Sequence, residues 1–179
     1  TFSSGCSDDL LNRQFNAGDV HVYGLETSLT QNFKGPGASR IWTSLFYTLT
    51  LSDFQSAFTS GNPLFGDVEK GDKLPYVPVH QGTVIAGLNW NPFEFNASMT
   101  YTGDMRDVAG QGSIESHELI AQHLVVDLSS SFQLSDGFRI YATAQNVLNS
   151  SYMVSRRPYG ARPGKPFEIL VGLKYDGSN

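Results

Sequence analysis

The feature that most constrains the fold of this chain is an alternation of apolar and polar side chains in stretches of about ten residues. The segment Val125–Leu134 shows it: from Val126 onward, even positions are apolar and odd positions are polar, with Ser130 as the exception. A period of two is typical of antiparallel strands with one apolar face. Strands of about 9–11 residues also cross a bilayer when they are tilted. The alternation therefore predicts a membrane β-barrel rather than a soluble sandwich.

Seven segments follow this rule, and short and long connections separate them in turn. The predicted strands are Val20–Phe33, Arg40–Leu51, His80–Trp90, Phe93–Gly103, Val125–Leu134, Phe138–Gln145 and Phe167–Tyr175. Residues 1–18 are predicted as loop, and long polar loops are predicted at 52–79, 104–123 and 149–165. Outer-membrane barrels have short periplasmic turns and longer extracellular loops. The order of the connections and the odd strand number therefore predict a piece cut from a larger barrel.

Aromatic residues near the ends of the apolar rows predict the two belts that mark membrane interfaces. The expected periplasmic belt contains Trp90, Phe93, Phe138 and Tyr175, and the expected outer belt contains Tyr23, Tyr47, Tyr101 and Phe167. Trp42 and Phe46 lie instead on the polar face of the second segment, so they are expected to pack inside the barrel.

Composition excludes several classes of protein. The chain has 179 residues and a mean hydropathy of −0.23. Its net charge of −5 argues against a nucleic-acid partner. No apolar run approaches the ~18 residues of a membrane helix. Its single cysteine, Cys6, excludes an intrachain disulfide. His117 and His123 are six residues apart rather than four, so they do not form a zinc-protease motif, and no other catalytic motif is present. We expect neither an enzyme nor a resident metal or cofactor.

The strongest charge signal is the connection 149–165, which holds four basic residues and no acidic one. Guanidinium groups bind carboxylates and phosphates in a bidentate manner. An anionic ligand is one partner that would fit; lipopolysaccharide phosphates and structural pairing with neighbouring loops are the alternatives. The candidate ligand-binding residues are Arg156, Arg157, Arg162 and Lys165, together with the predicted loop histidines His117 and His123.

A second group of polar residues is predicted to face the lumen of the barrel. There, ion pairing between acids and Arg139 or Lys174 is expected more than contact with a substrate. The group consists of Glu26, Glu94, Asp127, Arg139, Gln145, Glu168 and Lys174.

Four segments resemble motifs of the C-terminal part of TonB-dependent outer-membrane receptors, in the right order. They are residues 16–26 (NAGDVHVYGLE), 74–80 (LPYVPVH), 145–152 (QNVLNSSY) and 157–166 (RPYGARPGKP). The last is most similar to the ferric dicitrate branch. The chain departs from the family pattern at its end, where Tyr175 is followed by Asp-Gly-Ser-Asn rather than closing the chain with an aromatic residue.

The resemblance implies that residues 1–179 are part of one antiparallel barrel of roughly 22 strands. It implies that the plug domain and the TonB box belong to a missing N-terminal part. It also implies TonB-dependent uptake of a ferric chelate, either ferric citrate or a siderophore, across a bacterial outer membrane. The implied partners are this chelate, membrane lipid and lipopolysaccharide, and, through the missing part, TonB and the plug.

Two other interpretations stay open on sequence grounds. One is a small closed barrel with a structural or adhesive role, which needs an eighth strand within residues 1–15. The other is a soluble β-sandwich binding module, in which the apolar rows are buried between two sheets.

Overall fold

The computed structural model describes residues 18–157 and 159–176, and the regular structure within them is all β. None of these residues forms a helix long and apolar enough to cross a membrane. The predicted loop before Gly18, Cys6 and the Gly-Ser-Asn end of the chain lie outside the described residues.

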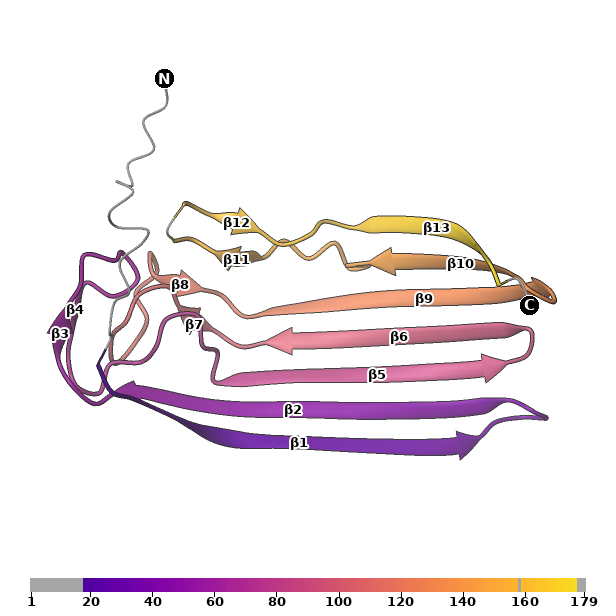
Figure 1. Cartoon of the computed structure of the whole chain (residues 1–179), viewed down its shortest axis with the longest axis horizontal. Coiled ribbons are helices and arrows are strands. Elements are labelled where there is room, and N and C mark those ends of the chain that lie inside the picture. The colour runs from indigo at the N-terminus through magenta and orange to yellow at the C-terminus, as the bar shows by residue number, and fades with distance from the viewer. Residues whose placement is uncertain (1–17, 158, 177–179) are drawn as a thin grey trace, which may run out of the picture.

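Seven long strands form one antiparallel sheet in the order β1-β2-β5-β6-β9-β10-β13 (Figure 1). This confirms the predicted strands, and the largest difference is that β2 continues to Phe54 instead of ending at Leu51. Each strand lies beside its predecessor, as expected for a meander that curls into a barrel wall. The bounds are β1 Val20–Lys34, β2 Arg40–Phe54, β5 His80–Trp90, β6 Phe93–Thr102, β9 His123–Ser135, β10 Phe138–Gln145 and β13 Glu168–Tyr175.

The register of the ladder aligns the apolar rows of neighbouring strands on one face. A slip of one residue would turn a whole row to the other face, so the register and the sequence pattern specify each other. Two of the apolar cross-strand rows are Leu29–Leu45–Val84–Met99–Val126 and Phe33–Ile41–Leu88–Phe95–Ser130–Ala142–Val171. Ser130, the exception in the sequence pattern, is the one polar residue of the second row.

The apolar face is exposed over the whole sheet. Leu29 is 64% exposed and Val171 is 71% exposed. In the described part of the chain the buried hydrophobic side chains are Phe54, Val68, Met105 and Ile120, and none of them lies in the middle of the sheet. A face of this size needs an apolar solvent, and hydrocarbon supplies it in a transmembrane barrel.

The two other interpretations do not fit this arrangement. The β-sandwich is wrong because the described residues contain no second large sheet to cover the apolar face. A small closed barrel would join β1 to β13, but these strands lie at opposite edges of the sheet. The stretch that would have to supply an eighth strand lies outside the described residues.

Short turns and long loops lie at opposite ends of the sheet (Figure 1). At the short-turn end, Gly137 has φ +86°, and an added Cβ would lie 2.7 Å from the Asp176 carbonyl oxygen, so this turn requires glycine. The expected periplasmic aromatic residues pack here: the ring centroids of Phe138 and Tyr175 are 4.6 Å apart.

The long loops are more ordered than the sequence indicates. They contain three two-stranded sheets, and His123, expected in a loop, is the first residue of β9. The short strands are β3 Phe58–Thr59 with β4 Asp67–Val68, β7 Met105–Arg106 with β8 Leu119–Ile120, and β11 Met153–Ser155 with β12 Arg162–Pro163.

Two adjacent valines test the assignment of the faces. Val126 pairs with Met99 on the apolar face, and Val125 pairs with Thr100 on the polar face. In a full-length protein that carries this segment, we expect Val126→Arg to lower the free energy of unfolding from lipid vesicles by about 2 kcal/mol, because the charge enters hydrocarbon. Val125→Arg should lower the free energy of unfolding clearly less. Urea titration measures both, and equal losses would contradict the assignment.

Candidate functional site

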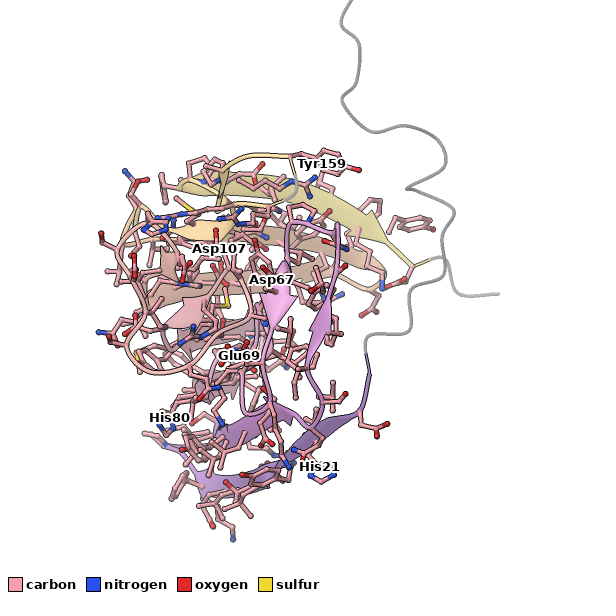
Figure 2. All side chains as sticks on the ribbon, turned by 90° about the vertical axis from the view of Figure 1, so that its left-hand side faces the viewer. His21, Asp67, Glu69, His80, Asp107 and Tyr159 are labelled. Carbon is pink, nitrogen blue, oxygen red and sulfur yellow. The ribbon has the colours of Figure 1, made fainter. Side chains whose placement is uncertain are left out.

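The long loops gather at one end of the sheet into a structure that we call the loop cap, residues 55–79, 103–122 and 146–167. Figure 2 looks at this end and shows Asp67, Glu69 and Asp107 among the loop segments. The cap brings together segments that are far apart in the sequence.

The first loop has a hydrophobic core of its own. The Phe54 ring contacts those of Phe58 and Phe65 edge to face, with centroids 5.3 and 6.0 Å away, and Val68 is buried beside β3. Such aromatic pairs add about 0.5–1.5 kcal/mol to the burial of their area. The sequence prediction of a polar loop missed this cluster, although its closely spaced phenylalanines were a signal for it.

Tyr76 fastens the first loop to the last. Its backbone lies in the left-handed region at φ +59°, which is uncommon for a residue other than glycine. Its amide donates to the Arg106 carbonyl at 2.8 Å, and its hydroxyl accepts from the amides of Arg156 and Arg157 at 3.2 and 2.9 Å. These bonds offset the unfavourable backbone conformation. In the sequence, Tyr76 has no indicated role beyond its place in the LPYVPVH motif.

Asp107 joins the second loop to the last by an ion pair. Its side chain is 2% exposed, and its Oδ2 accepts from Arg157 Nε at 3.2 Å. Its Oδ1 is buried and has no hydrogen-bond partner among the described residues. Removing one partner of such a pair lowers the stability of the fold, because the other charge is then buried without a compensating charge. Asp107 was not among the predicted site residues, and no local pattern in the sequence indicates it.

The other basic residues of the last loop are held differently. Arg156 Nε contacts the Met153 sulfur at 3.0 Å, and its Nη1 donates to the His117 carbonyl. The Arg162 guanidinium lies 5.9 Å from the centre of the Tyr159 ring, a cation–π distance. Arg156 and Arg157 therefore belong to the loop junction, whereas Arg162 lies on the hairpin formed by β11 and β12.

Lys165 lies at the base of this hairpin. Its ammonium group donates to Gln145 Oε1 at 3.2 Å, at the end of β10. It contacts the wall of the barrel rather than the junction around Arg157.

The two candidate histidines occupy separate places. His117 is exposed and lies 3.3 Å from Glu115 and 3.8 Å from Glu118. His123 stacks on Tyr152 with ring centroids 4.4 Å apart. In the described part of the chain, no group of three or more metal-ligating residues is assembled.

Asn146 organises the base of the last loop from a buried position. Its amide group donates to the carbonyls of Ser150 and Lys165 at 3.0 and 2.8 Å, and its Oδ1 accepts from the Ser150 amide. Its own backbone amide donates to Asp127 Oδ1 at 2.8 Å, which ties the loop to β9. Asp127, predicted to face the lumen, thus anchors the loop cap.

The remaining residues of the predicted lumen row are only partly brought together. Glu94 and Arg139 form an ion pair at 3.5 Å, and Arg139 also donates to Gln133. Lys174, expected to pair across the lumen, pairs instead with Asp176 at 3.1 Å. Glu26 and Glu168 lie on the polar face, opposite Thr48 and Gln145.

Trp42 is one of the two aromatic residues that are expected to pack inside the barrel. Its indole ring lies across Gly87, where an added Cβ would come within 2.3 Å of the ring.

A polar recess of about 390 Å³ opens at the short-turn end of this face. The Glu94–Arg139 pair lines it together with Arg40, for which no ion pair is formed within the described residues. The recess lies at the opposite end of the sheet from the loop cap.

Comparison with known proteins identifies the family. Residues 1–147 match the family described as TonB dependent receptor-like, beta-barrel. The chain belongs to this family. No curated protein matches the sequence.

Solved structures show the same fold. The chain is similar to the ferric-catecholate import receptor Fiu from E. coli K12 in its closed form, with a TM-score of 0.56, 14% identity, and coverage of 87% of this chain and 25% of that one. It is also similar to a chain of the FpvAI–pyocin S2 complex, with a TM-score of 0.62, 14% identity, and coverage of 87% and 19%. The chain thus spans about a quarter or less of the length of these proteins. Its fold is an antiparallel transmembrane barrel segment from a family of transport receptors, which is not an enzyme family.

The role of Asn146 in this receptor segment is testable. In the full-length receptor, Asn146→Ala should raise the hydrogen-exchange rates of amides 147–167 by tenfold or more, since buried polar partners left unsatisfied cost about 1–3 kcal/mol each. Asn149→Ala is the matched control: Asn149 also has a positive φ, of 48°, but its side chain accepts one exposed bond, from the Phe167 amide at 3.2 Å. Equal effects of the two variants would show that Asn146 is not the anchor.

Proposed function

We propose that this chain is the C-terminal wall and loop segment of a receptor in a bacterial outer membrane, and that the receptor imports an anionic ferric chelate with energy delivered through TonB. The segment contributes the barrel wall and the loops that capture the ligand. The plug and the TonB contact belong to other parts of the receptor.

The observation that carries this proposal is a set of partly exposed guanidinium groups in the loop cap. Arg157 uses only its Nε in the pair with Asp107, and its two Nη groups are neither fully buried nor hydrogen-bonded in the described part of the chain. Arg156 keeps one Nη group free, and Arg162 is held by a ring face instead of an acid. Arginines that keep donors free bind planar carboxylates in a bidentate manner.

Ferric citrate is the chelate that best fits these donors, because it presents carboxylates. The absence of acidic residues from 149–165 and the similarity of 157–166 to the ferric dicitrate branch support it. A siderophore with other anionic oxygens is the wider class, and His117 lies at the edge of the same junction through its carbonyl contact with Arg156.

The two faces of the sheet suggest the remaining partners. The apolar rows contact outer-membrane lipid, and lipopolysaccharide surrounds the loop end. The polar face, with the recess beside Arg40 and the Glu94–Arg139 pair, meets the plug. Charged and polar groups on that face would then be covered by a polar protein surface rather than by hydrocarbon.

Binding of ferric citrate to the full-length receptor tests the proposal. Arg156→Gln with Arg157→Gln should weaken binding about tenfold or more, because charge-assisted hydrogen bonds are each worth about 1.5–3 kcal/mol. Lys34→Gln removes a positive charge at the other end of the sheet, outside the recess, and should leave affinity within about twofold, because salt screens charges at that distance. Fluorescence titration measures both. Equal affinities for the wild type and the first variant, or no binding by the wild type, would refute the proposal.

A further inference from the structure

We propose that Asp107 is a positioning residue for ligand capture: it fixes the Nε edge of Arg157, so that the two Nη groups are presented in one orientation to an anionic oxygen of the ligand. This inference rests on the proposed function, and it assigns a role to a residue that does not itself touch ligand.

The Arg157 guanidinium is divided between two environments. Its Nε donates to a carboxylate that is 2% exposed, whereas the Arg157 side chain is 36% exposed and its Nη groups form no hydrogen bond among the described residues. A guanidinium held on one edge loses less rotational freedom when the other edge binds a carboxylate. The buried acid therefore prepares the exposed edge for a bidentate contact.

Both partners of the ion pair are also held by hydrogen bonds from their backbone amides. The Asp107 amide donates to the Glu118 carbonyl at 3.0 Å, and the Arg157 amide donates to the Tyr76 hydroxyl at 2.9 Å. The Tyr76 amide in turn donates to the carbonyl of Arg106, the neighbour of Asp107. The contacts of Asp107, Arg157, Tyr76 and Arg106 thus form a closed ring around the ion pair. As a result, the long side chain of Arg157 has a defined position although it lies on a loop.

The negative charge of Asp107 does not help to attract an anionic ligand. A carboxylate with an unpaired Oδ1 lowers the positive potential around Arg157, which by itself disfavours an anionic ligand. Attraction of the ligand therefore gives no reason for an acid at this position, but orientation of Arg157 does. If Asp107 acted only through its charge, removing that charge would raise the affinity for the anionic ligand. If Asp107 orients Arg157, removing the charge lowers the affinity.

The experiment uses the full-length receptor, with ferric citrate as the probe. Asp107→Asn keeps the shape of the side chain and removes its charge. We expect affinity to fall about tenfold, because the oriented charge-assisted bond to Arg157 is lost. Asp67→Asn is the matched control: Asp67 is an exposed acid of the same loop cap that accepts from the Thr59 hydroxyl at 2.9 Å. It removes the same charge and should leave affinity unchanged or slightly higher. Asp107→Glu, which restores a carboxylate, should recover part of the affinity.

Hydrogen exchange of amides 153–163 separates positioning from a structural role. Positioning predicts rates within about threefold of the wild type in Asp107→Asn, since the backbone bonds of the hairpin remain. Weaker binding together with rapid exchange over the whole hairpin would show that the pair only holds the fold, and would overturn the inference. Unchanged or tighter binding would overturn it as well.

Arg157→Gln separates the inference from the proposed function. If Arg157→Gln weakens ferric citrate binding and Asp107→Asn does not, the inference alone fails. If the wild type does not bind ferric citrate, or if Arg157→Gln has no effect, the proposed function fails and the role of Asp107 fails with it.

Discussion

The rest of the structure depends on the register of one antiparallel ladder. The sheet has almost no buried side chains of its own, so its strands are held together by backbone hydrogen bonds and by neighbours on the same face. Because side chains alternate with a period of two, this one register sorts the side chains into an apolar face and a polar face. The row from Leu29 to Val126 lies on one side, and the row that contains Thr30 and Ser98 lies on the other. Each face then requires its own surroundings: hydrocarbon on the first, polar groups on the second.

The loop cap follows a different principle. Its segments are stabilised like a small soluble domain, with Phe54, Val68 and Ile120 buried and with polar contacts that reach from one loop to another. Tyr76 and Asp107 make the contacts to the last loop, and Asn146 fixes the base of that loop on β10 and β9. Loops fastened in this way do not have to be ordered by a ligand, which lowers the entropic cost of binding. The cap combines this order with arginine side chains that keep part of their hydrogen-bonding capacity free.

Much of the fold follows from local pattern, and the site follows from it only in part. The strands and the separation of short from long connections could be read along the chain, because each depends on neighbouring residues. The basic loop 149–165 was also visible as a run without acids. The partner of Arg157 was not, since Asp107 lies fifty residues earlier in an unpatterned segment. The first loop was predicted as a polar connection, although the closely spaced phenylalanines around Phe54 were a local signal for its core.

The sequence by itself determined the faces of the strands, their number and their order, because period-two alternation and turn residues act within a few positions of one another. It also determined which loop carries the positive charge. Only the tertiary structure decided what holds that charge. The association of Tyr76, Asp107 and Arg157 comes from the meeting of three loops at one end of the sheet, and contacts between distant segments leave no periodic signal in any one of them. It also decided that His123 belongs to β9 and that Asp127 anchors a loop, since both depend on where neighbouring strands end.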